Sequence, residues 1–91
     1  MTVTTISGFT FDVDEEKLDD WRVVEAIADA SNEDDKAAQL RGVAALVRYI
    51  FGEKKKAFFK HLASKHEGRI PAEAVNDDVR NIMDQLAAVK N

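Results

Sequence analysis

Apolar and polar residues alternate along the first thirteen positions of the chain. The alternating residues are Val3 and Thr5 before Ser7-Gly8, and Phe9, Phe11 and Val13 after it. Because every second side chain of a β-strand points to the same face, the last three share one face. Two β-rich runs around a short glycine-containing turn predict a β-hairpin over residues 1–13. An isolated hairpin is marginally stable in water, so we expect its apolar face to pack on helices.

After Asp14 the apolar period changes to that of an α-helix. Asp14 is a suitable N-cap, because Glu15 and Glu16 follow it in the first turn, where the helix dipole favours carboxylates. Asp19 or Asp20 offers a second start after a short first turn. The apolar residues at helical spacing are Leu18, Trp21, Val23, Val24, Ile27 and Ala28. Because they cover two sides of the helix, we expect it to lie between the hairpin and the later helices.

Three more helical segments follow a polar connection. The spacing predicts helices from about Lys36 to Phe51, from Glu53 to Lys65, and from Pro71 onward, and a glycine ends each of the first two. Their apolar residues are Leu40, Val43, Val47 and Ile50, then Phe58, Phe59 and Leu62, and finally Val75, Val79, Ile82, Met83 and Leu86. Asn76-Asp77-Asp78 offers a point at which a new cap would interrupt the last helix.

Together these elements predict an α+β, mostly α, fold. We expect a single domain over residues 1–91, with the hairpin (1–13) packed on a bundle of about four helices (14–91). The length suffices for one modest core, and a content of 45% hydrophobic and 33% charged residues is typical of a globular protein.

The composition also indicates the cellular compartment of the protein. The chain has no cysteine, which excludes disulfides and thiolate metal sites and favours a reducing compartment. Its apolar runs are far shorter than the ~20 residues that span a bilayer, and its N-terminus lacks the pattern of a signal peptide. We expect a soluble, cytoplasmic protein.

The net charge of −4 hides a strong asymmetry along the chain. Residues 1–35 carry eleven acidic and two basic groups, whereas residues 36–70 carry nine basic and two acidic groups. Such a distribution can steer partners or pack copies of the chain head to tail. The plainer interpretation is that the two halves attract each other within one fold.

The residue types that carry catalysis do not form a catalytic pattern. His61 and His66 are five positions apart, about 140° around a helix, whereas helical zinc pairs lie four apart. We interpret them as solvated histidines at a helix end. The adjacent carboxylates Glu15/Glu16, Asp19/Asp20, Asp34/Asp35 and Asp77/Asp78 stand near predicted helix starts, where capping explains them.

Serine and glycine patterns lead to the same expectation. The serines at positions 7, 31 and 64 lack the G-x-S-x-G setting of an activated nucleophile. The four glycines form neither a phosphate-binding loop nor a dinucleotide fingerprint. We therefore expect no enzyme, and no catalytic, cofactor-binding or metal-binding residues.

Basic and aromatic residues gather in the middle of the chain. They are Arg41, Arg48, Lys54, Lys55, Lys56, Lys60, Lys65 and Arg69, with Tyr49, Phe51, Phe58 and Phe59. Such a mixture can bind phosphates and stack bases. However, Phe58 and Phe59 have the spacing of core residues, and a pI near 5.1 opposes nucleic-acid binding, for which domain values above ~9 are typical. A solvated helix face or a surface for an acidic protein segment fits better.

Trp21 is the one tryptophan of the chain. Its helical spacing predicts a core anchor beneath the hairpin. The alternative is a place in an apolar groove for a partner, because tryptophan is enriched at the centres of interfaces.

Two stretches of the chain follow an order found in a known family. Ile6–Val13 is a hairpin, and Asp14–Trp21 ends in an acidic-acidic-Trp element before a helix. Further along the chain, glycines separate the predicted helices in the order helix–Gly–helix–Gly–helix. The two segments that contain these glycines are Arg48–Lys54 and His66–Pro71. In these features the chain resembles the tail assembly chaperones of long-tailed bacteriophages and related prophages.

The resemblance implies a role in binding protein and not in catalysis. Such chaperones keep the long, largely helical tape-measure protein soluble while tail tube subunits polymerise around it. Tail tube subunits and further copies of the chain are additional implied partners. Our hypothesis is that the basic face of residues 41–65, with neighbouring apolar side chains, contacts the client. The candidate contact residues are Arg41, Arg48, Lys54, Lys55, Lys56, Lys60 and Trp21. The alternatives are a bacterial adaptor or regulatory domain and, below it, a helical nucleic-acid-binding domain.

Overall fold

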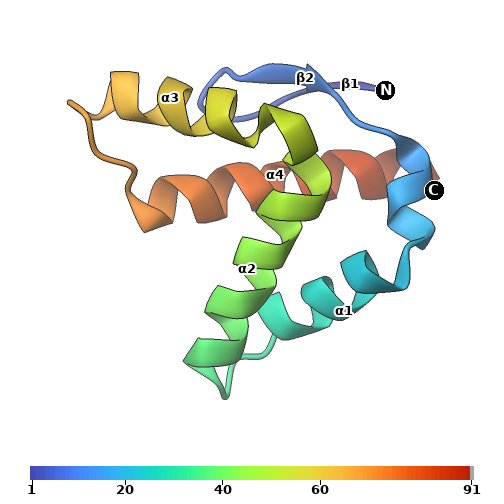
Figure 1. Cartoon of the computed structure of the whole chain (residues 1–91). Helices are drawn as coiled ribbons and strands as arrows, with labels where there is room; N and C mark the ends of the chain where they lie inside the picture. The colour runs from blue at the N-terminus through green and yellow to red at the C-terminus, as the bar shows by residue number, and fades with distance from the viewer. Residues whose placement is uncertain (91) are drawn as a thin grey trace.

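A computed structural model describes residues 1–90, which form two β-strands, four α-helices and two short 3₁₀-helices (Figure 1). In chain order these are β1 (Thr2–Thr4), β2 (Thr10–Asp12), η1 (Glu15–Asp19), α1 (Trp21–Ala30), α2 (Lys36–Phe51), η2 (Gly52–Lys54), α3 (Lys55–Lys65) and α4 (Ala72–Lys90). The predicted α+β, mostly α, fold is confirmed.

The hairpin pairs its two strands antiparallel, with Val3 opposite Phe11. Both of these side chains are buried, and so is Val13, as the alternation predicts. Gly8 lies in the turn with φ at 95°, a left-handed conformation that side chains other than glycine rarely adopt. The turn can therefore close tightly enough to bring both strands onto the helices.

A stack of aromatic rings joins the hairpin to α2 and α3. The ring centroids of Phe11 and Phe51 lie 4.6 Å apart, and those of Phe51 and Phe58 lie 4.0 Å apart. Phe9 adds a tilted contact with Phe58 at 5.6 Å. Aromatic pairs at these separations stabilise a core beyond their buried area. The expected packing of the hairpin on helices is confirmed.

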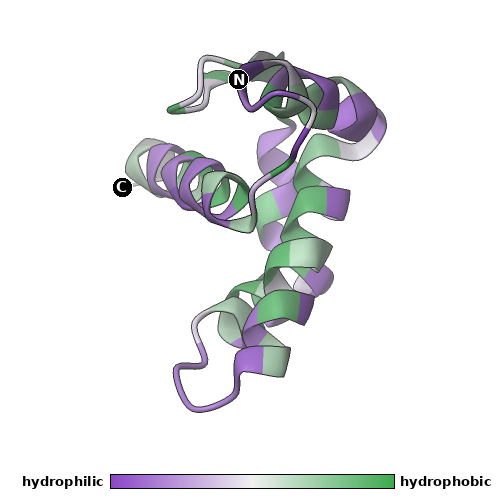
Figure 2. Cartoon of the chain, turned by 90° about the vertical axis from the view of Figure 1, so that its left-hand side faces the viewer, coloured by the Kyte–Doolittle hydropathy of each residue, from purple (hydrophilic) through white to green (hydrophobic). Residues whose placement is uncertain are grey.

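α1 and α2 form an arm that projects away from the hairpin, α3 and α4 (Figures 1 and 2). The two helix backbones approach so closely that a Cβ added to Gly42 would lie 2.3 Å from the amide nitrogen of Ala30. It would also lie 2.6 Å from the carbonyl oxygen of Ala26. Only glycine fits at this crossing, so Gly42 sets the distance between the helices.

The first helical segment begins later than its first cap suggests. Asp14 caps only the 3₁₀-helix η1, by accepting from the amide of Glu16 at 3.0 Å. α1 starts after Asp20, which accepts from the amide of Arg22 at 2.9 Å. The second start that the sequence offers is the one that is used, and Asp35 caps α2 in the same way.

α1 does not lie between the hairpin and the other helices, so that expectation is wrong. Its buried residues, Val23 and Ala26, face α2, which is its main packing partner. Trp21 is 70% exposed, and its predicted role as a core anchor is also wrong. Leu40, expected in the apolar stripe of α2, is 66% exposed. The reason is that the first turns of α2 extend past α4 (Figure 1).

α4 lies beneath the hairpin and beside α2, burying Val79, Ile82 and Leu86. It runs without interruption through Asn76-Asp77-Asp78, contrary to the expected break. Asp78 is not a cap, because it is buried within α4 and binds the turn of the hairpin. Asp78 is therefore part of the hydrogen bonding at the hairpin turn.

Candidate functional site

A groove of about 470 Å³ lies where the arm meets α4. α1 contributes Ile27, α2 contributes Leu40 and Val43, and α4 contributes Val79 and Met83. Glu33 and Arg80 are the charged residues among those that line it. Apolar and polar side chains therefore share the lining of the groove, as they do in protein-binding grooves.

A row of exposed apolar side chains continues the groove along α1. Trp21, Val24 and Ile27 are three residues apart, so each neighbours the next on the surface of the helix. Val24 is 40% exposed and Ile27 36% exposed, and Ile27 also lines the groove next to Leu40. We call Trp21, Val24, Ile27 and Leu40 the apolar row. Contiguous exposed apolar residues of this kind mark interaction surfaces.

The start of the apolar row is held by a short polar network. The indole N–H of Trp21 donates to Glu25 at 3.0 Å, which orients the ring on the surface of α1. Asp20 pairs with Arg22 at 2.6 Å. The side-chain hydrogen bond from Arg22 lowers the pKa of Asp20 to about 2, assisted by the backbone N–H of the same residue.

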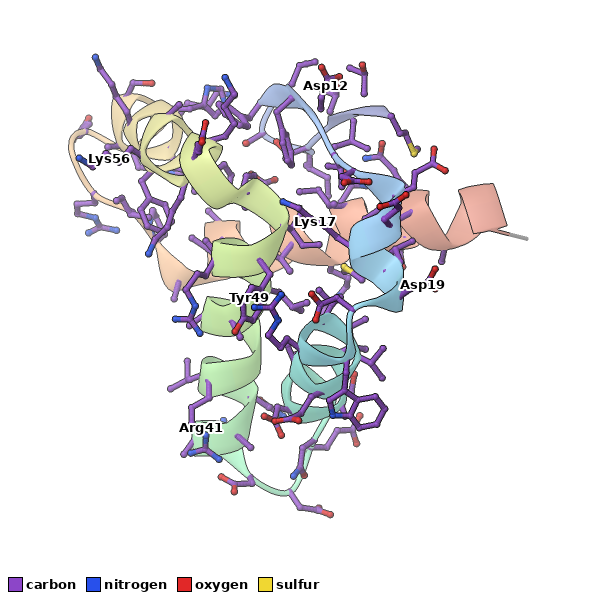
Figure 3. All side chains as sticks on the ribbon, turned by 45° about the vertical axis from the view of Figure 1, so that its right-hand side comes forward. Asp12, Lys17, Asp19, Arg41, Tyr49 and Lys56 are labelled. Atoms are coloured by element: carbon purple, nitrogen blue, oxygen red, sulfur yellow. The ribbon has the colours of Figure 1, made fainter. Side chains whose placement is uncertain are left out.

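Tyr49 is enclosed by two arginines where α1 meets the end of α2. The guanidinium carbons of Arg22 and Arg48 lie 5.0 Å and 5.3 Å from the centre of its ring. The ammonium of Lys17 donates to the backbone carbonyl of Tyr49 at 2.9 Å, so η1 is fastened to α2 (Figure 3). Arg22 and Lys17 therefore join α1 and η1 to α2, whereas Arg48 contacts the ring from within α2 itself.

The predicted partner-binding residues lie in three places. Trp21 is at the start of α1, Arg41 is exposed on α2, and Lys56 is on α3 at the opposite end of the molecule (Figure 3). The exposed lysines of η2 and α3 are Lys54, Lys55, Lys56 and Lys60. Among the described side chains, none of these four has a carboxylate within 4 Å. Their charge faces solvent, and Lys55 lies 5.7 Å from the centre of the Phe59 ring.

Ser7, His61 and Asp78 meet at the turn of the hairpin, which the sequence does not predict. The hydroxyl of Ser7 donates to Asp78 at 2.5 Å, and its amide donates to the same carboxylate at 3.0 Å. His61 donates from Nε2 to the carbonyl oxygen of Ser7 at 2.9 Å, and so does Lys65 at 2.7 Å. His61 is therefore half-buried and engaged, and its interpretation as a solvated histidine is wrong.

The hydrogen bonds of this cluster run in the wrong order for nucleophilic catalysis. An activated serine gives its proton to a histidine that a carboxylate orients. Here the serine hydroxyl donates directly to the carboxylate of Asp78, and the imidazole hydrogen-bonds to the backbone carbonyl of Ser7 and packs on the ring of Phe9. The cluster fastens the turn to α3 and α4, and it satisfies Asp78, which is 2% exposed.

The sequence predicts only a small part of the apolar surface formed by the apolar row and the groove. The sequence singles out Trp21 as a partner contact, but it assigns Leu40, Val43 and Met83 to the core. The signal that could have found the surface is on α1, where apolar residues occupy more of the circumference than one packing partner can cover.

The described residues hold neither a metal-binding cluster nor a membrane-spanning helix. No group of three or more histidine, aspartate or glutamate side chains is placed to hold a metal ion. No helix in this part of the chain is both long and apolar enough to cross a bilayer. No family model, curated protein or solved structure matches the chain.

Proposed function

We propose that this protein is a cytoplasmic, non-enzymatic tail assembly chaperone that binds a phage tape-measure protein and keeps it soluble during tail morphogenesis. The observation that carries the proposal is the apolar row beside the groove, an uncovered surface on an otherwise packed helix pair. The resemblance of residues 6–21 and 48–71 to such chaperones names the class of client.

In this proposal, many copies of the chain bind along one client. A tape-measure protein is a long helical chain with apolar stripes that aggregate when left uncovered. A domain whose axes measure 34 × 32 × 20 Å covers only a few helical turns, so many copies are needed. Weak contacts then add along the client, because each bound copy forms part of one multivalent assembly.

The lysines of η2 and α3 provide a second contact in this proposal. They are exposed, without carboxylate partners among the described side chains, and far from the apolar row. A charged face of this kind speeds encounter with an acidic stretch of client or with the acidic α1 side of a neighbouring copy.

A nucleic-acid-binding role has less support. The aromatic rings that would stack bases include Phe51 and Phe58, which are buried in the aromatic stack. An adaptor role for some other helical partner fits the same surface, and the genes beside this one distinguish the two.

The test is co-expression with the client. The DNA on both sides of the gene is sequenced, and the long helical protein encoded nearby is expressed with and without this chain. We expect the client to stay in the soluble fraction and to co-purify only when the chain is present. Flanking genes unrelated to tails, or a client that is equally soluble alone, would contradict the proposal.

The same assay tests the lysine face. Replacing Lys54, Lys55 and Lys56 with glutamate reverses three exposed charges without touching the core. We expect client recovery to fall while the helical circular dichroism stays unchanged. Unaltered recovery would remove the lysines from the contact surface and leave the apolar row as the place of binding.

A further inference from the structure

We infer that the apolar row and its groove receive an amphipathic helix with an apolar stripe and basic residues toward its ends. The inference rests on the proposed function and specifies the chemistry of the client segment. The shape of the surface favours a helix: it is bounded by α1, α2 and α4, and its apolar residues on α1 recur every three positions. A helix that lies in such a groove presents residues at intervals of three, four and seven.

The acidic residues around α1 determine which charge the ends of the partner helix should carry. Residues 14–35 carry ten acidic groups against Lys17 and Arg22. Both cations are engaged within the fold, Lys17 at the carbonyl of Tyr49 and Arg22 at Asp20. Glu15 and Glu16 stand in η1 before α1, and Glu25 and Asp29 lie within α1. Three more acids, Glu33, Asp34 and Asp35, stand in the polar connection after α1, which is the purple loop at the foot of the arm in Figure 2.

These acidic ends are separated by the length of α1, about 15 Å for its ten residues. A partner helix of about three turns, lying along α1, would bring its two ends next to them. Lysine or arginine at those ends is attracted at low ionic strength, and glutamate is repelled. Charge complementarity therefore points to basic ends and an apolar middle.

A second copy of this chain does not match that description. Its most basic helix is α3, whose large apolar residues Phe58 and Leu62 are fully buried in its own core. α3 offers lysines without an apolar stripe, so it can approach the acidic ends but cannot fill the groove. The occupant is a helix from another chain.

The experiment uses Trp21 as its own reporter. Because Trp21 is the single tryptophan and is 70% exposed, docking of an apolar helix moves its emission to shorter wavelength. The probes are two synthetic peptides of about 18 residues, with the same leucine stripe over their middle three turns. One has lysines directly before and after the stripe, and the other has glutamates at the same positions. We expect the lysine peptide to bind at least about tenfold more tightly at low salt, with the difference shrinking as salt rises.

A matched pair of variants locates the binding. Leu40→Glu places a charge in the apolar row, and Ile6→Glu places one on the hairpin turn at a residue that is equally exposed, 69% against 66%. We expect Leu40→Glu to weaken the lysine peptide by about tenfold or more and Ile6→Glu to leave it unchanged. Both residues are exposed, so neither change removes core packing.

The outcomes separate the inference from the proposed function. Equal binding of both peptides, or equal loss in both variants, overturns the inference while client co-purification still supports the function. A concentration-dependent dimer of the protein alone that Leu40→Glu abolishes also overturns it, because the surface is then an interface between copies. Loss of client co-purification in wild type contradicts the function itself.

Discussion

At the hairpin end, large aromatic side chains fill the space between elements, whereas in the α1–α2 arm small residues let two backbones touch. The hairpin end stacks Phe11, Phe51 and Phe58, all of them buried. The arm meets at Gly42, where a methyl group has no room. The first arrangement buries Val3, Phe11 and Val13 of the hairpin, and the second leaves Trp21, Val24 and Ile27 of α1 exposed.

The contrast explains where a partner can bind. Where two helices touch at small residues, the sides that face away from the crossing have no partner in the pair, so large apolar side chains on those sides face solvent. Trp21 and Leu40 are such residues. At the other end, even a carboxylate, Asp78, is enclosed and satisfied by Ser7. The hairpin end therefore supplies stability, and the arm supplies the surface.

The largest expected effect comes from breaking the aromatic stack. Phe58→Ala removes a ring with 0% exposure that contacts both Phe9 and Phe51. We expect the free energy of unfolding to fall by about 3–5 kcal/mol, because the lost transfer energy is joined by a cavity. Urea unfolding followed by circular dichroism measures it.

Phe59→Ala is the matched control on the same helix, because Phe59 is only partly buried and packs at the edge of the core. It should lose clearly less stability than Phe58→Ala. Phe58→Leu keeps most of the volume and should fall in between, so the comparison remains measurable if the alanine variant fails to fold. Equal losses for Phe58 and Phe59 would contradict the central place of the stack.

A smaller effect is expected in the arm, where a Gly→Ala change, which usually stabilises a helix, should lower the free energy of unfolding. Gly→Ala in an ordinary helix stabilises by about 1 kcal/mol. At Gly42 the new Cβ would lie 2.3 Å from the backbone of Ala30, so the helices must separate. We expect Gly42→Ala to destabilise by about 2 kcal/mol, measured by urea unfolding. A stabilised variant would mean that the backbones of α1 and α2 are not in contact.

Much of the fold follows from local pattern. Alternation locates the hairpin, and the apolar stripe with its terminal glycine gives α2 the bounds Lys36–Phe51. Capping chemistry is local too, so Asp14, Asp20 and Asp35 could be recognised as caps. Each of these signals lies within a few residues of the feature that it predicts.

The candidate site depends on distances that local pattern does not contain. Asp78 looks like a cap until Ser7, 71 positions away, is placed against it. Leu40 has the spacing of a core residue, but the end of α4 decides whether it is covered. Trp21 is exposed because Gly42 brings α2 against the other side of α1. Periodicity shows that a helix has an apolar face, and only tertiary packing shows which part of it stays open.

The smallest expected effect is a pH dependence confined to the start of the arm. The pKa of Asp20 lies at about 2 in the folded protein, against 3.8 for an ordinary aspartate, chiefly because its carboxylate accepts from the Arg22 side chain. Between these values the unfolded chain takes up a proton that the folded chain does not. The stability that Asp20 contributes is therefore complete above about pH 4 and is lost as pH falls through about 2. Asp20→Asn keeps an N-cap acceptor but cannot titrate, so we expect its unfolding free energy to depend less steeply on pH in this window.

Arg22→Ala provides the control for this dependence, because it removes the largest cause of the lowered pKa and keeps the backbone donor. It should remove part of the pH dependence of the unfolding free energy. When it is combined with Asp20→Asn, that pH dependence should not change further. Emission of Trp21, the next residue after Asp20, reports unfolding at this end, and circular dichroism reports the whole chain. If the slope between pH 4 and 2 is the same in wild type and both variants, the pair does not stabilise the start of α1. The acid sensitivity of the protein would then belong to carboxylates other than Asp20, and the Asp20–Arg22 pair would not distinguish the arm from the hairpin end.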